Sequence, residues 1–320
     1  MLTLPDFREK KIVFIQAEKD IENQIRFWNS NIRLYKDGVF VDQISCYLIL
    51  SLFIVGNVTI TSTLIHKAKK YGISLFLLNY SFRSYAEILS VAEGNYTLRK
   101  IQYTMSKAKE LEYSKNIIKN KITNQILLIK KIHKIDLKEE VEVASRQIEK
   151  TNYVQTLLGI EGNIANKYFP ILFQSYDWNR RSPQTKEDIT NLLMDIGHTY
   201  LFNYVDSLLR LFGFDTYKGF YHQLFFQRKS LSCDVMEVFR PLIDMTILKA
   251  YNLKVIDAKD FTFKNGTYSL KFEGKIRNKY SKIFFDVITE HKEEIYTYLR
   301  FFYLHLMNPT KYKFPTYILP

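Results

Sequence analysis

Three short stretches of the sequence combine residue types that can do chemistry. The first, GIEG at 159–162, places Glu161 between two glycines. The second, GFYH at 219–222, places His222 just after a glycine in an aromatic setting. In the third, Asp234 and Glu237 are three residues apart, which puts both carboxylates on one face of a helix. Two like charges at that spacing are unfavourable unless a cation neutralises them.

Each stretch also has an ordinary structural interpretation. Glu161 can be a solvent-facing residue at a glycine-broken helix start, and the small residues beside it permit close backbone approach. His222 can be a packed core histidine, and Asp234 with Glu237 can be an acid pair on the surface of an amphipathic helix. Arg240, four residues before Asp244, can neutralise that carboxylate.

Taken together, the three stretches predict a metal site. Two or three carboxylates and one neutral imidazole form a hard, oxygen-rich donor set, which suits Mg²⁺ or Mn²⁺ better than structural Zn²⁺. Cys233 is a single thiol in this region and cannot build a zinc site alone. In a basic protein such a site indicates phosphodiester chemistry, because the ion offsets charge that develops at the phosphoryl group.

The charge of the chain favours a polyanionic partner. The formal net charge is +13 over 320 residues, and residues 96–135 carry ten basic side chains against Glu110 and Glu112, a net of +8. Arg228 and Lys229 lie close in sequence to Asp234 and can hold a phosphate. Arg99, in the basic segment, is a further candidate DNA contact.

Several other classes of protein are disfavoured. The sequence contains no GxxxxGK[ST], GxGxxG, GxSxG or HExxH pattern, which argues against P-loop hydrolases, typical Rossmann enzymes, α/β-hydrolases and zincins. Two cysteines are too few for a disulfide framework and fit a reducing cytoplasm. The longest apolar stretch, 46–55, is too short for a membrane span of about 20 residues.

The elements that position these residues fall into two groups, and the predicted fold class is α+β. An N-terminal β-rich domain is expected over residues 1–93, and a larger, mostly α-helical catalytic domain over residues 94–320. The first domain has short β-branched or aromatic runs at 11–16, 31–35, 39–44, 47–55, 73–78 and 85–89, with one helix at 61–71 closed by Gly72.

Helical periodicity dominates from residue 96 onward. Residues 96–134 can form one long helix or a broken pair, and further helices are expected at 138–158, 161–173, 187–212, 234–251, 280–289 and 293–306. Asn265-Gly266 between alternating aromatic residues, through Phe272, predicts a β-hairpin over 260–273. The segment 175–184 is expected to be a loop, and the tail after residue 308 to be extended.

Five motifs in the helical part resemble one known family, the CRISPR-associated integrase, which is the catalytic subunit of the spacer-acquisition complex. They occur in the family's order: Gly94-Asn95 with Leu98-Arg99 and Gln102; Gly159 to Gly162 with Ala165 and Tyr168-Phe169; Arg181, Pro183, Asp188 and Asn191; Gly213 to Asp215 leading to Gly219–His222; and Arg228 with Ser230-Leu231, then Asp234 to Pro241 with Asp244. Each motif alone is weak, whereas five in order are specific.

The resemblance implies a function and a set of residues. It implies metal-dependent integration, in which the 3′-hydroxyl of a short prespacer DNA attacks a phosphodiester at the edge of a CRISPR repeat. The family's metal ligands carry over to Glu161, His222 and Glu237, and Asp234 assists them indirectly or as an alternative ligand. The partners implied are double-stranded DNA, a second copy in a homodimer, and a small CRISPR-associated subunit that bridges two dimers.

Two other hypotheses remain open on the sequence alone. A non-catalytic DNA-binding scaffold would use the same basic segment and would keep the acids for structural reasons; its DNA binding would depend on salt but on no metal. A peripheral membrane-surface protein would use the lysine-rich helix at 96–134 and would bind liposomes, although the polar stretches of that helix argue against it.

Overall fold

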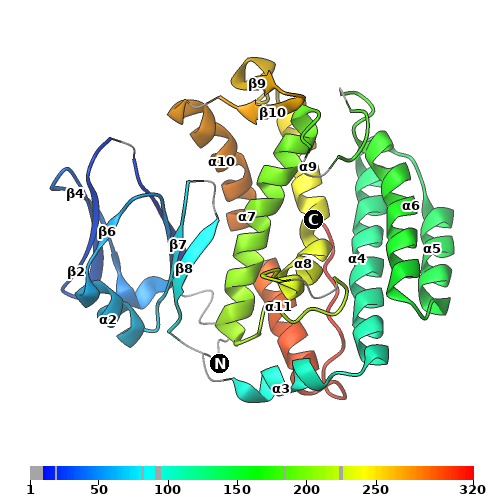
Figure 1. Ribbon diagram of the computed structural model, residues 1–320, viewed down its shortest axis with the longest axis horizontal. Coiled ribbons are helices and arrows are strands. Elements are labelled where there is room, and N and C mark those ends of the chain that lie inside the picture. The colour runs from blue at the N-terminus through cyan, green and yellow to red at the C-terminus, as the bar shows by residue number, and fades with distance from the viewer. Residues whose placement is uncertain are drawn as a thin grey trace. The chain divides into compact units, whose positions relative to one another are not determined.

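The computed structural model describes residues 10–18, 20–80, 83–90, 95–176, 178–182, 185–222, 226–271 and 273–320. The chain separates into two compact units (Figure 1). Unit 1 contains the residues up to Ile101 together with Asp206–Asp215, and unit 2 contains Gln102–Val205 together with Thr216–Pro320. The predicted domain boundary, between residues 93 and 94, lies outside the described residues.

Unit 1 is built on two four-stranded sheets. In the first sheet the strand order is β1-β5-β7-β8, with β1, β5 and β7 parallel and β8 antiparallel to β7. In the second sheet the order is β4-β3-β2-β6. The strands are β1 (Lys11–Gln16), β2 (Asn23–Trp28), β3 (Asn31–Lys36), β4 (Val39–Ser45), β5 (Ile49–Val55), β6 (Thr59–Ile60), β7 (Ser74–Leu78) and β8 (Ser84–Ile88).

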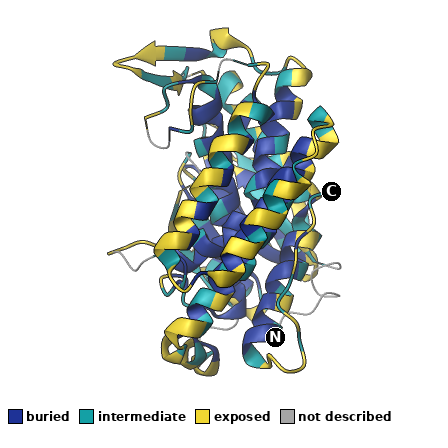
Figure 2. Cartoon of the chain, turned by 90° about the vertical axis from the view of Figure 1, so that its right-hand side faces the viewer, coloured by how far each residue is buried: buried dark blue, intermediate teal, exposed yellow. Residues whose placement is uncertain are grey.

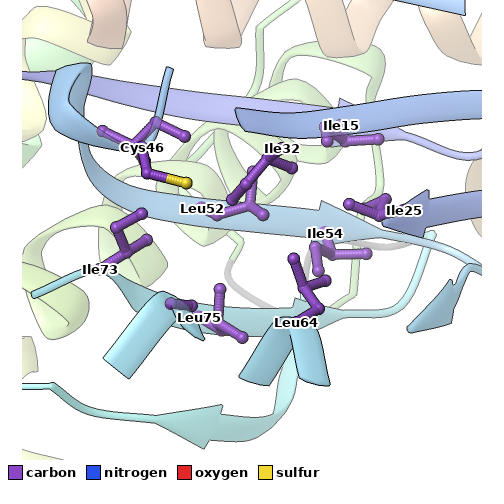
Figure 3. Packing of buried hydrophobic residues seen from close by; sticks show 11 residues of the cluster. Ile15, Ile25, Ile32, Cys46, Leu52, Ile54, Leu64, Ile73 and Leu75 are labelled. Carbon is purple, nitrogen blue, oxygen red and sulfur yellow. The ribbon is translucent and has the colours of Figure 1, made fainter. Parts of the chain in front are cut away.

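Both sheets contribute to one hydrophobic core (Figure 3). Ile25 from β2 and Ile54 from β5 are fully or almost fully buried in it, with Leu64 from the helix α2 (Ser62–Lys70). Cys46 is also buried there, and burial raises the pKa of its thiol to about 11. Cys46 and Cys233 are both free thiols, as the cysteine count predicts.

The predicted α+β class is confirmed, and most predicted strands occur within one or two residues of their expected ends. The helix α2 starts after Thr61, whose hydroxyl accepts from the amide of Leu64, and Gly72 follows it with φ +74°. The strand β2 was not predicted. Its sequence, NQIRFW, alternates buried and exposed positions only partly, and pairing with β3 and β6 on either side fixes it.

Within its described residues, the helical part of the chain contains two short 3₁₀ segments besides its α-helices. Its helices are α3 (Tyr96–Thr104), α4 (Lys107–His133), α5 (Lys138–Lys150), α6 (Val154–Leu172), α7 (Ile189–Phe212), α8 (Ser230–Met236), α9 (Arg240–Asn252), α10 (Gly274–Glu290) and α11 (Lys292–Met307). The 3₁₀ segments are η2 (Glu237–Phe239), which joins α8 to α9, and η3 (Ala258–Asp260).

Several of the predicted helices have different boundaries. The helix expected over 234–251 is formed by α8, η2 and α9 from Ser230 onward, and the helix expected over 280–289 begins at Gly274. The segment 96–134 is the broken pair α3 and α4, because Ser106 caps a new helix by accepting from the amide of Lys109. The predicted helix over 138–158 ends at Lys150, since the backbone of Thr151 and Tyr153 is extended. The next helix therefore begins at Val154 rather than at Glu161, and Glu161 lies inside α6.

The site is held by a group of helices in unit 2. Helix α4 packs against α5, α6 and the η2 segment, and Figure 1 shows α4, α6 and α5 side by side. In Figure 2, which views this group from outside, exposed residues lie on the outward faces of the nearer helices and buried residues lie behind them. The inward face of α4 carries Ile117, Ile118 and Leu128, and among them Lys121.

The remaining predictions for this part of the chain are largely met. The hairpin is formed by β9 (Phe261–Lys264) and β10 (Thr267–Leu270), with positive φ at both Asn265 and Gly266; Phe272 lies outside the described residues. Before α7, the Arg181 guanidinium donates to Asn191, whose amide in turn donates to Asp188. Pro183 of that motif and Asp177 of the predicted loop are not described. Within the described residues, no helix is long and apolar enough to cross a membrane.

Candidate active site

Glu161 and Glu237 share one cation. The ammonium of Lys121 on α4 donates to Oε1 of Glu161 on α6 and, at 2.6 Å, to Oε2 of Glu237 at the α8–η2 junction. The Lys121 and Glu237 side chains are only 8% and 3% exposed. Two carboxylates that are 76 residues apart in sequence therefore converge on a single buried point.

The second oxygen of each carboxylate has its own partner. The Tyr221 hydroxyl donates to Oε2 of Glu161, and Arg240 donates to Oε1 of Glu237 at 2.9 Å. The guanidinium of Arg240 bonds to Glu237, one helical turn before it, whereas Asp244 accepts from Tyr168 at 3.1 Å. Arg240 still favours the charged form of Asp244 through its charge, although the two are not the bonded pair. The interpretation of a surface acid pair is wrong, since Asp234 and Glu237 are both buried.

The ionisation of this cluster follows from its contacts. Burial alone would raise the pKa of Glu161, but attraction to Lys121 and hydrogen bonds from Lys121 and Tyr221 outweigh burial and lower that pKa to about 2. Burial alone would lower the pKa of Lys121, yet the charges of Glu161 and Glu237 raise it. Burial, with the neighbouring Glu161 charge, raises the pKa of Tyr221 far above its usual range. Glu161 is thus a carboxylate beside the Lys121 ammonium, with Tyr221 as a neutral donor.

Asp234 holds the segment that carries His222. Its Oδ2 accepts from the backbone amides of Phe220 at 2.7 Å and Tyr221 at 3.0 Å. Its Oδ1 accepts from the backbone amide of His222 at 2.8 Å and bonds to Nδ1 of the same residue at 2.7 Å. Since Asp234 is fully buried and each oxygen has two partners, its contacts are those of a residue that orients His222.

Gly219 is required by this close approach. A Cβ on Gly219 would lie 2.6 Å from Oδ2 of Asp234 and 2.7 Å from the backbone carbon of Ser230. No side chain fits there without displacing α8 or breaking the bonds to Asp234. Close packing against Asp234 and Ser230 therefore explains why a glycine stands at position 219.

The glycines beside Glu161 differ. Gly159 and Gly162 lie within α6, and a Cβ on either would meet no atom within 4 Å. The predicted close backbone approach is therefore absent within the described chain. Both glycines lie on an exposed face of α6. Because glycine has a low helix propensity, each of them makes this helix less stable than alanine would.

The predicted metal ligands are assembled in two pairs. Lys121 joins Glu161 to Glu237, and Asp234 holds His222; Tyr221 connects the pairs, because its hydroxyl contacts Glu161 and its backbone precedes His222. Across the described residues, no three acidic, histidine or cysteine side chains are close enough together to hold a metal ion.

The donor chemistry nevertheless fits a hard divalent cation. Two carboxylate oxygens already converge on one cation, the Lys121 ammonium, and both are of the type that Mg²⁺ and Mn²⁺ prefer. The bond from Nδ1 of His222 to Asp234 leaves Nε2 as the ring nitrogen for an ion, and a carboxylate partner of this kind is typical of metal-bound histidines.

The three predicted DNA contacts have different surroundings. Arg228 is exposed and Lys229 is partly buried, both just before α8. Arg99 is exposed on α3, and its Nε donates to the carbonyl of Gly213 at 3.2 Å. Arg228 also interacts with the Cys233 thiol, whose pKa is nevertheless raised by burial.

A cavity of about 650 Å³ lies beside Tyr221 and His222. Its lining includes Lys107 and Lys218, which both pair with Glu110, and the exposed ring of Tyr153. The cavity therefore combines an excess of positive charge with an exposed aromatic surface next to His222.

Sequence reasoning missed Lys121 and Tyr221 as members of the site. Lys121 was counted only as part of a basic segment. A signal was present, however: Lys121 falls four residues after Ile117, three after Ile118 and seven before Leu128, in the apolar stripe of α4, where a charge needs a buried partner. Tyr221 gave no separate signal, because an aromatic residue beside a histidine is common in protein cores.

The structure defines an α+β protein in which a buried pair of carboxylates and an oriented histidine share one helical unit. The chain belongs to the family described as CRISPR associated protein Cas1, whose model matches residues 20–284. This confirms the resemblance noted in the sequence.

Curated relatives are similar in sequence, and solved structures are similar in fold. The chain is 29% identical over 264 residues to CRISPR-associated endonuclease Cas1 1 of Thermodesulfovibrio yellowstonii, covering 78% of this chain and 82% of the relative. It is 25% identical over 229 residues to CRISPR-associated endonuclease Cas1 3 of Thermus thermophilus, covering 69% of each chain. Its fold is similar to that of a Cas1 protein from Thermotoga maritima, with a TM-score of 0.75 at 19% identity over 93% of this chain and 97% of that one. It is also similar to a casposase bound to its integration product, with a TM-score of 0.74 at 18% identity over 94% and 92%.

Proposed function

We propose that this protein is a metal-dependent DNA endonuclease and integrase that inserts short prespacer DNA into a CRISPR array. The observation that carries the proposal is the convergence of Glu161 and Glu237 on one buried cation, in a chain of the Cas1 family. Relatives named as Cas1 endonucleases support the activity. A casposase caught with its integration product supports strand transfer within this fold.

In this function, Glu161, Glu237 and Nε2 of His222 would hold Mg²⁺ or Mn²⁺. When bound, the ion would polarise the scissile phosphate and offset its developing charge. Asp234 holds His222 in the tautomer that presents Nε2, and Tyr221 fixes the second oxygen of Glu161. These residues determine where an ion can lie before DNA arrives.

The reaction is a transesterification. The 3′-hydroxyl oxygen of the prespacer forms a bond to phosphorus at the repeat edge, and the bond from that phosphorus to the target strand's own 3′ oxygen breaks. The attacking hydroxyl loses its proton and the departing oxygen gains one. Arg228 is exposed, and Arg228 and Lys229 directly precede α8. From there their positive charges can neutralise a phosphate near this site.

The DNA path runs along the cavity beside His222. Lys107 and Lys218 provide positive charge there, and the exposed Tyr153 ring offers a surface on which a base can stack. Arg99, on α3, is a further DNA contact from residues of unit 1. By the predicted boundaries Arg99 lies at the start of the helical catalytic domain of residues 94–320, just after the β-rich domain of residues 1–93.

The expected partners follow from the family. A solved neighbour is described as part of a Cas6-RT-Cas1–Cas2 complex, which supports a small CRISPR-associated subunit as partner. We propose that the protein works as a homodimer, that two dimers are bridged by that subunit, and that the assembly acts on double-stranded DNA in the prokaryotic cytoplasm.

A strand-transfer assay tests the proposal. Purified protein, its small partner, a short prespacer duplex and a supercoiled plasmid with a CRISPR array are combined in Mg²⁺, in Mn²⁺ and in EDTA. We expect metal-dependent nicked and joined products, which Glu161→Ala abolishes. Glu149→Ala is the matched control, because Glu149 pairs with Lys119 on the exposed side of α4 and α5. Equal product in EDTA, or full activity of Glu161→Ala, would overturn the proposal.

The alternative of a non-catalytic DNA-binding scaffold predicts a different result from the same assay. It predicts salt-dependent DNA binding with no product in any metal. The buried carboxylate pair favours the enzyme, because a scaffold gains nothing from burying two acids at one point.

A further inference from the structure

We infer that Lys121 is a tethered placeholder for the metal ion, and that its displacement makes metal binding depend on DNA. Its ammonium lies between Glu161 and Glu237, where the ion of the proposed function would bind. The inference rests on that proposed function and extends it, because it assigns a positioning residue and a coupling between cofactor and substrate.

The hydrogen bonds of the carboxylates single out Lys121 as the group that an ion replaces. All four carboxylate oxygens have partners: Tyr221 and Arg240 bond to the outer oxygen of each acid, and Lys121 bonds to the remaining two. An ion that bridges Glu161 and Glu237 through the oxygens facing each other must take the two bonds that Lys121 makes. The contacts of Tyr221 and Arg240 can persist.

The backbone of α4 around Lys121 is held in place, so only the side chain of Lys121 has to move when an ion displaces it. Asn120 and Asn124, on either side of it in α4, are both buried and bond to the carbonyl of Tyr317 at 2.6 and 3.0 Å. The amide of Tyr317 returns a bond of 2.8 Å to Asn120. A lysine has a flexible four-carbon stem, and its ammonium can move several ångströms without moving this helix.

The charge balance links the displacement to DNA. In the described structure, Glu161 and Glu237 are balanced by Lys121 and Arg240. A divalent ion adds two positive charges and leaves the Lys121 ammonium without its carboxylates, in a poorly solvated site. Uncompensated buried charge is costly, and a DNA phosphate supplies the missing negative charge. Metal and DNA therefore bind more tightly together than separately, and the coupling is reciprocal.

The inference also explains how the site is formed without an ion. Two carboxylates buried at one point repel each other. Lys121 donates to one oxygen of each and so holds the two side chains together. The protein can thus remain folded in the metal-free state with its ligands already in position.

Mn²⁺ binding, measured by the electron paramagnetic resonance signal of free Mn²⁺, tests the inference without relying on activity. The full-length wild type, Lys121→Met and Lys119→Met are titrated with Mn²⁺ alone and with a short DNA duplex, and binding to DNA alone is subtracted. Lys119 is the matched control, because it is an exposed lysine on the same helix that pairs with Glu149.

We expect Lys121→Met to bind Mn²⁺ about tenfold more tightly than the wild type without DNA, because the competing ammonium is gone. DNA should tighten Mn²⁺ binding by about tenfold in the wild type and in Lys119→Met, and by much less in Lys121→Met. Equal or weaker Mn²⁺ binding by Lys121→Met, or an unchanged effect of DNA, would overturn the inference.

Two further variants separate this inference from the proposed function. Glu161→Gln and Glu237→Gln should lose the site-specific Mn²⁺ binding in every background. If the wild type binds Mn²⁺ and these variants bind it equally well, the proposed metal site itself fails and the inference falls with it. If only the Lys121 comparison fails, the metal site stands.

Lys121→Met leaves two buried carboxylates without their ammonium and can lower stability. Thermal unfolding in EDTA and in Mn²⁺ uses this effect as a readout: the Tm of the variant should fall in EDTA and recover in Mn²⁺ more than that of the wild type. Lys121→Gln, which keeps a polar donor, is the second variant. A Tm deficit that Mn²⁺ does not reduce in either variant would contradict the placeholder role.

Discussion

Oδ1 of Asp234 lies 2.7 Å from Nδ1 of His222 and 2.8 Å from the backbone amide of the same residue. One oxygen therefore fixes both the ring and the backbone of the histidine. With Oδ2 bound to two further amides, Asp234 organises the turn formed by residues 220–222. Its part in the site is to fix His222, while Glu161 and Glu237 face the cation.

Replacement of Asp234 should lower the stability of the folded protein as well as its rate of strand transfer. Asp234→Ala leaves three backbone amides and one imidazole without their acceptor, and should lower the free energy of unfolding by about 3 kcal/mol. Urea denaturation measures this change. Asp286→Ala, on the exposed side of α10, is the control and should leave the midpoint unchanged. Equal midpoints for both variants would show that Asp234 does not organise the turn.

Gly219→Ala should be destabilising. The added Cβ would lie 2.6 Å from the Asp234 carboxylate and 2.7 Å from backbone carbon of Ser230, and backbone cannot yield as a flexible side chain does. We expect a loss of about 2 kcal/mol, typical of overpacking in a tight core, with loss of the His222 position. Chemical denaturation and DNA strand transfer should both report the defect; a neutral effect would refute the close packing around Asp234.

Gly162→Ala should have the opposite effect on stability. A Cβ there meets no atom within 4 Å, and alanine is favoured over glycine inside a helix by about 1 kcal/mol. The variant should therefore unfold at higher urea concentration. If the open face of α6 beside Glu161 receives DNA, the same methyl group should reduce strand transfer severalfold. A stabilised variant with full activity would show that this glycine has no role with DNA.

Asp244→Asn should change how stability depends on pH. Burial, only partly offset by the Tyr168 hydroxyl and nearby cations, raises the pKa of Asp244 from 3.8 to about 6. Between these values the folded state holds a proton that the unfolded chain has lost, so raising the pH through this interval destabilises the wild type. The asparagine variant lacks this effect. Its stability relative to the wild type should increase by about 3 kcal/mol between pH 3 and pH 7.

Denaturant titrations of both proteins at a series of pH values measure this difference. The gap should be smallest below about pH 4 and should reach a plateau above about pH 6. A difference that stays constant with pH would mean that Asp244 has an ordinary pKa in the folded protein.

The local pattern of residues was sufficient for most of the fold. Short β-branched or aromatic runs identified strands such as Lys11–Gln16, and Asn265-Gly266 identified the hairpin turn, because these signals depend on neighbours in sequence. The start of α6 was misplaced for the opposite reason. Gly159 and Gly162 suggested a helix end, yet α6 continues through them because its other face packs on α4.

The sequence was sufficient to predict the acids and the histidine of the candidate site, but not Lys121. Glu161, His222 and Glu237 stand in motifs with a family pattern, whereas Lys121 belongs to no motif and lies 40 residues from its nearer partner. Only tertiary packing brings α4 against α6 and η2 and buries that lysine. The pairing of Arg240 with Glu237 was missed because helical spacing allows either Glu237 or Asp244, and the two acids differ only in their three-dimensional surroundings.

The most direct test of this account is the position of a bound metal ion. Crystals of the protein soaked in Mn²⁺, with a short DNA duplex, should give an anomalous difference peak at about 2.0–2.6 Å from carboxylate oxygens of Glu161 and Glu237. Nε2 of His222 should complete the contacts, with the Lys121 ammonium withdrawn from between the two acids. A Mn²⁺ peak elsewhere, with Lys121 still bridging Glu161 and Glu237, would contradict the account.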